Sequence, residues 1–285
     1  MTPSSFEYFS PSTLEEACRL LESHPGEARV LAGGQSLIPL LKMRFTTLSY
    51  LVDISRIPGL SEIREENGTL HIGPMVRVAE LNDAPSVRQY HAIADAARII
   101  ADPLVRNMGT VGGNLSHGDP SNDLPAVMIA MNAVFTVTST VVSRRINARD
   151  FYLDTFTTAL KEGEILSSIS VPGHSGSAYL KQKRSAGDFS VAGVAVALDM
   201  DGRLCRWCGI GLTSVGPVPL SAAKAEEMLR GNELNASLIE RAASEASMEA
   251  RPSSDFYGTA EYKRYVVKKL TKEAIELAIR RAGGQ

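Results

Sequence analysis

Two glycine-rich segments are the parts of the sequence whose residue types point most directly to ligand chemistry. The first is Ala32-Gly33-Gly34-Gln35-Ser36, and the second is Asn-Met-Gly-Thr-Val-Gly-Gly-Asn at residues 107–114. Glycine reaches positive φ angles at little cost and lets a ligand approach the main chain closely. Successive backbone N–H groups in such turns bind anions, and the start of a following helix adds partial positive charge. Two such segments could hold one diphosphate, as a dinucleotide cofactor requires.

Neither segment is a common phosphate-binding motif. Gly33-Gly34 lacks the third glycine of a GxGxxG fingerprint, and the sequence contains no GxxxxGK[ST] motif. From the residues alone, tight hairpin turns or close backbone packing remain an alternative explanation of either segment.

The elements expected around the first segment form a small α/β lobe. Ser12-Thr13-Leu14-Glu15 reads as a capping box that opens a helix ending near Gly26. Short apolar runs at residues 28–32 and 50–54 are typical of buried strands. The pattern therefore predicts strand–helix–strand alternation on both sides of the first glycine-rich segment.

The second segment falls in a stretch that we predict to be a long loop, from Arg106 to Pro120, because it is glycine-rich and lacks periodicity. Long loops in compact domains are usually functional. A helix is predicted before it at about residues 86–101, ended by Asp102-Pro103, and another begins at Asn122. Strands are predicted at residues 69–72, 134–138 and 165–171.

The pattern changes after Pro172-Gly173. Three runs predict an antiparallel meander, and helices fill the remainder from residue 221; the runs are 179–184, 191–198 and 204–212. We therefore place a domain boundary at residue 173. It divides the chain into domain 1–173, with lobes at about 1–56 and 57–173, and domain 174–285.

Cys205 and Cys208 form a CxxC pair, for which a redox couple or half of a metal site is one interpretation. The pair lies on a strand that returns from a turn at Asp201-Gly202. Residues three apart on a regular strand point to opposite faces, so we expect the two thiols not to converge. The sequence has no second pair to complete a zinc or iron–sulfur site, so we expect neither a metal nor a cluster in this chain.

Composition favours a cytoplasmic protein without nucleic acid partners. The formal net charge is -2, which gives no strong attraction to nucleic acid or anionic membranes. The N-terminus lacks the pattern of a secretory signal. The most apolar run, residues 126–137, is shorter than the roughly 20 residues that span a bilayer. We therefore expect no membrane span.

Five stretches, in order along nearly the whole chain, resemble the medium subunits of carbon monoxide dehydrogenase and related molybdenum hydroxylases, a family that includes the flavin domain of xanthine dehydrogenase. The long second motif is the most specific of them. The stretches are Leu31–Arg44, Arg106–Leu115, Asp119–Pro125, Tyr179–Phe189 and Glu261–Arg264.

The resemblance implies an α+β fold with noncovalently bound FAD. A two-lobed PCMH-type FAD-binding domain would be followed by a three-stranded antiparallel sheet with a helical bundle. The implied cofactor-binding residues are Leu31, Ala32, Gly33, Gly34, Gln35, Ser36, Leu37, Ile100, Ala101, Val105, Gly109, Thr110, Gly112, Gly113, Asn114, Asp123, Leu166 and Lys181.

The resemblance also implies roles for several of these residues. The segments 32–36 and 110–114 would hold the diphosphate, and Asp123 would contact a ribose or ribityl hydroxyl. Leu166 would lie near the adenine or flavin, and Lys181 would approach the flavin. Asp123 could instead be an acid at a helix start, and Lys181 a solvated residue on an edge strand. For His117 we favour packing near the ribose, or one hydrogen bond, over metal or covalent flavin attachment.

The implied function is that of an electron-transfer flavoprotein subunit with no catalytic residue of its own. Its partners would be an iron–sulfur subunit and a molybdenum-cofactor subunit, and its acceptor NAD+, a quinone or oxygen. A stand-alone flavin oxidase or dehydrogenase for a small molecule is the alternative, and a noncatalytic FAD scaffold is a third.

Overall fold

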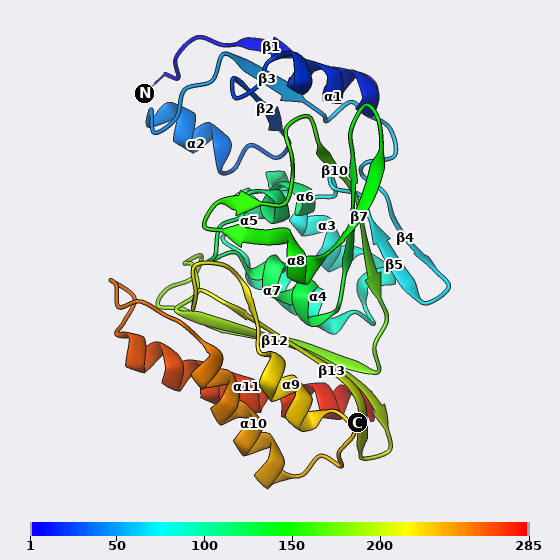
Figure 1. Ribbon diagram of the computed structural model, residues 1–285, viewed down its shortest axis with the longest axis vertical. Coiled ribbons are helices and arrows are strands. Elements are labelled where there is room, and N and C mark those ends of the chain that lie inside the picture. Colours follow the sequence, from blue (N-terminus) through cyan, green and yellow to red (C-terminus); the bar gives the residue numbers. More distant parts are fainter. Residues whose placement is uncertain (1, 284–285) are drawn as a thin grey trace.

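The computed structural model describes residues 2–283, which form three tiers along the longest axis of the molecule (Figure 1). The N-terminal tier is a parallel sheet of order β1-β3-β2 with helices α1 and α2. Cys18 and two neighbours on α1 are buried against this sheet. The bounds are β1 Glu7–Phe9, α1 Leu14–Ser23, β2 Ala28–Leu31, α2 Leu37–Lys42 and β3 Tyr50–Asp53.

The predicted capping box of Ser12 and Glu15 does not form, and α1 is instead capped by Thr13 and Glu16. Thr13 is the N-cap, and its hydroxyl accepts a hydrogen bond from the amide of Glu16 at 3.1 Å. The carboxylate of Glu16 accepts in return from the amide of Ser12 at 3.0 Å. The reciprocal bonds satisfy two amides that would otherwise lack partners, so the helix begins at Leu14.

The middle tier is built on an antiparallel sheet of order β4-β5-β10-β6-β7. Its helices pack on this sheet around the largest apolar core of the molecule. The strands are β4 Ile63–Glu66, β5 Thr69–Ile72, β6 Val134–Thr138, β7 Ser143–Asn147 and β10 Ile165–Pro172, with a small hairpin of β8 Tyr152–Asp154 and β9 Thr157–Thr158. The helices are α3 Val78–Asp83, α4 His91–Ile99, α5 Pro103–Met108, α6 Val111–Ser116, α7 Asp123–Ala130 and α8 Ala148–Phe151, with a 3-10 turn η1 at Pro85–Val87.

The prediction of one long loop from Arg106 to Pro120 is wrong, because most of this stretch is helical. Asp102 caps α5 by accepting from the amide of Val105 at 2.9 Å, and Pro103 occupies the first helical position. Thr110 caps α6 by accepting from the amide of Gly113 at 3.2 Å. The predicted helix 86–101 is also shorter, since α4 begins only at His91.

The C-terminal tier is an antiparallel sheet of order β11-β12-β13-β14 covered by three helices. The three predicted strands form the meander, and the two-residue strand β14 adds a fourth. The bounds are β11 Gly176–Gln182, β12 Ala192–Asp201, β13 Leu204–Thr213, β14 Leu220–Ser221, α9 Ala223–Leu229, α10 Ala236–Glu249 and α11 Ala260–Ala282.

Helix α7 lies directly against β13 and joins the middle tier to the C-terminal tier. A Cβ atom added at Gly209 or Gly211 would overlap backbone oxygens of α7, so only glycine allows this approach. All eight residues of α7 are buried, which explains why its sequence shows no polar face.

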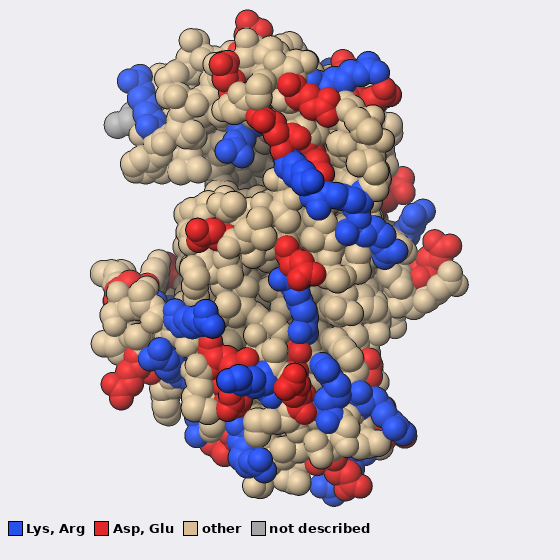
Figure 2. All heavy atoms as spheres, in the orientation of Figure 1, with Lys and Arg blue, Asp and Glu red and all other residues tan. Residues whose placement is uncertain are grey.

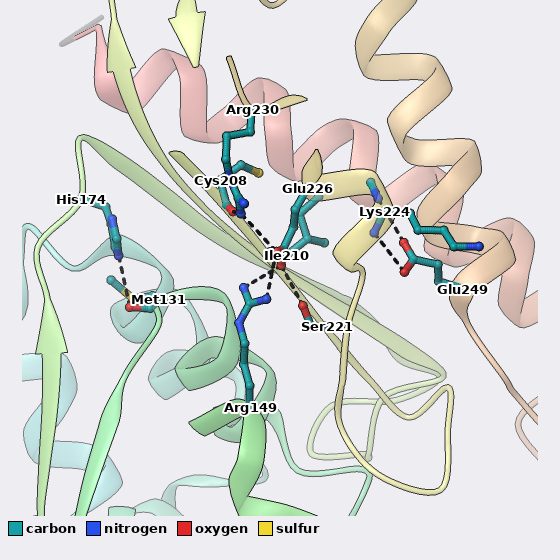
Figure 3. Close-up of polar contacts among 11 residues, drawn as sticks. Met131, Arg149, His174, Cys208, Ile210, Ser221, Lys224, Glu226, Arg230 and Glu249 are labelled. Atoms are coloured by element: carbon teal, nitrogen blue, oxygen red, sulfur yellow. Dashed lines mark hydrogen bonds and ion pairs between the residues drawn. The ribbon is translucent and has the colours of Figure 1, made fainter. Parts of the chain in front are cut away.

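Polar contacts reinforce the same junction (Figure 3). Arg149 of α8 forms two bonds, of 3.0 and 2.8 Å, to the carboxylate of Glu226 on α9. Glu226 also accepts from the amide of Ile210 and the hydroxyl of Ser221, each at 2.8 Å. Since Glu226 is 2% exposed, these donors are what make its burial tolerable.

The expectation that the thiols of Cys205 and Cys208 do not converge is wrong. The pairing of β12 with β13 shifts so that Asp199 faces Trp207 while Met200 faces Cys205, which leaves Arg206 as an extra residue. Such a bulge brings Cys205 and Cys208 onto the same face of the strand. Both are buried in the C-terminal core. The Cys208 thiol donates to Cys205, which lowers the pKa of Cys205 and raises that of Cys208.

Within residues 2–283, no helix combines the length and the apolar character needed to cross a bilayer.

Candidate cofactor site

The structure brings the two glycine-rich segments into direct contact. A Cβ atom added at Gly33 would overlap the carbonyl oxygen of Met108 and would lie 2.7 Å from the Cα atom of Gly109. A Cβ atom on Gly113 would lie 3.7 Å from the Cβ atom of Ala32. The end of β2 therefore packs against the start of α6.

The first segment presents a row of free amides. Gly34 has a φ angle of +72°, which turns the chain from β2 into α2 and is strained for any residue with a side chain. Within residues 2–283, no acceptor lies within hydrogen-bond distance of the amides of residues 33–37. Such a run of backbone donors is suited to bind an anion.

The second segment combines tight packing with an open face. Gly112 donates its amide to the Pro74 carbonyl at 2.8 Å, and a Cβ atom there would overlap Pro74. Close packing, the alternative explanation of this segment, therefore does account for Gly112. Gly113 faces the first segment instead, and the only atom closer than 3 Å to an added Cβ would be the Thr110 hydroxyl, at 2.8 Å.

Asn114 carries a buried polar atom without a partner. Its backbone oxygen accepts from the side chain of Asn122 at 2.9 Å, but its side-chain Oδ1 has no hydrogen-bond partner among the described residues. Buried polar atoms are nearly always paired, so this one calls for an explanation. A cofactor hydroxyl between the two segments would supply the missing partner, and the residues present thus fit a dinucleotide.

Four further predicted residues lie around the turn between α4 and α6. Arg106 Nη1 donates to the carbonyls of Ile100 and Ala101 at 2.7 and 3.2 Å, which holds Ala101 at a φ angle of +43°. The carbonyl oxygen of Val105 accepts a hydrogen bond from the amide of Gly109. A Cβ atom added at Gly109 would lie 3.7 Å from the Gln35 side chain. This turn therefore adjoins the first segment.

Asp123 and Lys181 form a buried ion pair that joins the middle and C-terminal tiers. Lys181 Nζ donates to Oδ2 of Asp123 at 2.9 Å, and the Tyr179 hydroxyl donates to Oδ1. The Lys181 side chain is 1% exposed, so it is not the solvated lysine that the sequence left open. Burial raises the pKa of Asp123, whereas Lys181 and Tyr179 act in the opposite direction. Asp123 is also the first residue of α7, so it is an acid at a helix start as well as a member of the ion pair.

Sequence reasoning assigned no role to Tyr179, although its spacing from Lys181 was visible. Two residues apart on a strand place both side chains on the same face, which is the signal that could have found it.

Leu166 and His117 are both associated with α6. Leu166 lies on β10, is buried in the middle core, and its strand packs against α6. His117 ends α6 with its ring centroid 5.2 Å from that of Phe156. Burial lowers the pKa of His117. Among the described residues, no three His, Cys, Asp or Glu side chains are grouped so as to hold a metal ion.

The surface of the molecule is indented beside this site. Figure 2 shows a hollow at the left, below the N-terminal tier, where α2 and α5 face one another in Figure 1. Positive and negative side chains are interspersed over this face. The hollow therefore carries no patch of a single charge on the face that Figure 2 shows.

Comparison with known proteins gives matches over the whole chain. Residues 4–174 match the FAD binding domain in molybdopterin dehydrogenase, and residues 177–278 match the CO dehydrogenase flavoprotein C-terminal domain. The carbon monoxide dehydrogenase medium chain of Hydrogenophaga pseudoflava is 39% identical, with 98% of each chain covered. The glyceraldehyde dehydrogenase medium chain of Sulfolobus acidocaldarius is 36% identical, covering 97% of this chain and 99% of that one.

A solved structure agrees with these matches. Carbon monoxide dehydrogenase from Hydrogenophaga pseudoflava, in a form lacking the Mo-pyranopterin moiety, superposes with a TM-score of 0.95 at 40% identity, with 99% of both chains covered. The chain therefore belongs to the family of FAD-binding medium subunits of the molybdenum hydroxylases, which are oxidoreductases.

Proposed function

We propose that this chain holds one FAD noncovalently between its two glycine-rich segments and relays electrons within a molybdenum hydroxylase complex. The observation that carries the proposal is the contact of Gly33 with Gly109, which places the free amides of the first segment opposite α6. The diphosphate of FAD would lie between residues 32–36 and 110–114. Asn114 Oδ1 would accept from a cofactor hydroxyl.

The buried pair would lie at the isoalloxazine end of the cofactor. Lys181 is held by Asp123 at 2.9 Å and by the Asp188 carbonyl at 3.4 Å, so its charge has a fixed position. A fixed cation beside the flavin stabilises negative charge added to it. Bound FAD would supply the redox chemistry, taking electrons singly from iron–sulfur clusters and giving pairs to NAD+, a quinone or oxygen.

The choice of organic substrate would belong to another subunit. Relatives of the same length are named as medium chains of a carbon monoxide dehydrogenase and of a glyceraldehyde dehydrogenase, two unlike substrates. We infer that this chain works with an iron–sulfur subunit and a molybdenum-cofactor subunit, and that its own residues bind and orient the flavin.

We also propose that residue 173 divides the chain into its two domains. The change from the middle sheet to the C-terminal sheet between Pro172 and Gly176 supports this division. Under this proposal the FAD lies mainly in domain 1–173, and Lys181 reaches it from domain 174–285.

Co-purification from the native host tests the proposed function. We expect the chain to elute with two other subunits, with FAD in a ratio near one per chain, and with iron and molybdenum. A chain that elutes alone, and whose flavin is bleached by an organic substrate, would establish the stand-alone oxidase or dehydrogenase instead.

A further inference from the structure

A row of hydroxyl groups leads away from the Asp123–Lys181 pair. The Tyr179 hydroxyl donates to Asp123, and the Ser190 hydroxyl lies close enough to Tyr179 to act on its pKa as a hydrogen-bond donor. The oxygen atoms of Ser190 and Ser214 lie 2.7 Å apart. Together with the 2.9 Å bond of Lys181 Nζ, these contacts form one continuous chain of hydrogen bonds from Ser214 to Lys181.

The inner groups of this row of hydrogen bonds are shielded from water, whereas the outermost group, Ser214, is not. Ser190, Tyr179 and Asp123 are 3%, 1% and 5% exposed. Ser214 is half-buried and lines a cavity of about 360 Å³. The cavity wall is polar and includes Ser121, Ser253, Arg251, Asp255 and Lys263. Water in this cavity can therefore reach Ser214 but not Lys181.

Two backbone features lie beside this row of hydrogen bonds. Gly193 faces Lys181 across the strands, and a Cβ atom there would overlap the Tyr179 hydroxyl. Ser214 adopts a φ angle of +64°, and its amide donates to the Pro120 carbonyl at 2.9 Å. Gly193 therefore makes room for Tyr179, and Ser214 holds a left-handed backbone conformation that costs free energy for a residue with a side chain.

We propose that Ser214, Ser190, Tyr179 and Asp123 form a proton relay between water in the cavity and Nζ of Lys181. The relay rests on the proposed function, since Lys181 would pass its proton on at the cofactor site. Reduction of a flavin by two electrons is accompanied by proton uptake, and the electrons would come from the iron–sulfur partner. The Lys181 side chain is 1% exposed, so a proton that it gives up would have to be replaced through neighbouring groups of the protein.

Each step breaks one bond to hydrogen and forms another. When Lys181 Nζ gives up a proton, it takes one from the carboxyl of Asp123, which has received the hydroxyl proton of Tyr179. Tyr179 is reprotonated by Ser190, Ser190 by Ser214, and Ser214 by a cavity water. One proton enters at the cavity, one leaves at Lys181, and every group in between regains its starting state. Burial is the largest influence on the pKa of Asp123 and raises it, whereas Lys181 and Tyr179 lower it.

The test uses the full chain loaded with FAD and reduced electrochemically in weakly buffered solution. A pH-indicator dye reports proton uptake, and flavin absorbance reports reduction. Tyr179→Phe and Ser190→Ala interrupt the relay, and Ser190→Thr restores a hydroxyl. Tyr90→Phe is the matched control, because Tyr90 is a buried tyrosine whose hydroxyl donates to the Gly68 carbonyl, outside the relay.

We expect Tyr179→Phe and Ser190→Ala to keep FAD and to slow proton uptake by roughly tenfold or more, whereas Ser190→Thr and Tyr90→Phe match the wild type. Unchanged proton uptake in Tyr179→Phe and Ser190→Ala would overturn the relay and leave FAD binding intact. Loss of FAD in both variants would also overturn it, since the hydroxyls would then be structural. A wild-type chain that takes up no FAD would overturn the proposed function together with the relay.

Discussion

At the scale of single residues, Gly33 decides whether the two glycine-rich segments can meet. Its missing side chain lets the first segment touch Met108 and Gly109. Glycine at this position is therefore required by the contact itself, and no turn with a positive φ angle is involved, unlike at Gly34. The same contact is what the proposed diphosphate site depends on.

Replacing Gly33 by alanine should separate the segments and lower FAD occupancy. The added Cβ atom would have to displace the α5–α6 turn, with a loss of about 1–3 kcal/mol in the free energy of unfolding. FAD content per chain and denaturant unfolding measure the two effects. Gly283→Ala is the control, because its φ angle is -84° and its nearest neighbour would be 3.7 Å away. Normal FAD content in Gly33→Ala would show that the contact is not needed.

The buried pair of Asp123 and Lys181 should show strong coupling in a double-mutant cycle. Asp123→Asn or Lys181→Met alone leaves a buried charge without its partner, at a cost of about 3–5 kcal/mol. The double variant should cost much less than the sum of the two, because no unpaired charge remains. Equilibrium unfolding in denaturant measures all three. Additive losses would mean that the two side chains do not interact in solution.

At the scale of elements, the sequence was informative where periodicity or caps are strong. The strands β2, β3, β6 and β10 and the start of α1 follow from apolar runs and a Thr–Glu cap. The helices α5 and α6 were missed because each has six residues, and α6 contains two glycines. Such helices owe their stability to caps and tertiary packing rather than to propensity.

The site was predictable only in part for similar reasons. The glycine-rich segments offer backbone amides as binding groups, and a glycine-rich run can be recognised directly in a sequence. Tyr179 acts through contacts with Asp123 and Ser190 that arise only when the C-terminal sheet packs on α7. The bulge at Arg206 depends on one extra residue in the pairing of β12 with β13, which no pattern of apolar residues reveals.

The ion pair between β7 and the turn before β10 should make stability depend on acid pH. Arg144 donates to both oxygens of Glu164, at 2.8 and 2.7 Å, and lowers the pKa of that carboxyl below its ordinary value of 4.5. Its contribution is therefore complete above 4.5 and is lost as the pH falls through the lower folded pKa.

Unfolding by denaturant at neutral pH and at pH values below 4.5 tests this dependence in the wild type and in Glu164→Gln. We expect Glu164→Gln to be less stable at neutral pH and to lose less stability on acidification. If acidification lowered the free energy of unfolding equally in the two proteins, the Arg144–Glu164 pair would not be the cause of the pH dependence.

At the scale of the whole molecule, the middle and C-terminal tiers are held together by α7 and by a few buried polar contacts. Arg149→Met should weaken the junction of the middle and C-terminal tiers, because the buried carboxylate of Glu226 would keep only Arg230, at 3.6 Å, as a charged partner. We expect a loss of about 1–3 kcal/mol in the free energy of unfolding.

The exposed pair of Arg206 and Asp201 provides a matched control for that prediction. Arg206→Met should change stability by less than about 1 kcal/mol, since exposed ion pairs contribute little. If thermal or denaturant unfolding gave the same loss for both variants, burial of Glu226 would not be what makes its ion pair important.

A crystal structure of the chain with FAD tests the central claim most directly. We predict that the diphosphate lies between the amides of residues 33–37 and the start of α6, with a cofactor hydroxyl on Asn114 and the flavin ring beside Lys181. A diphosphate bound elsewhere, with the amides of the first segment facing only water, would contradict the account.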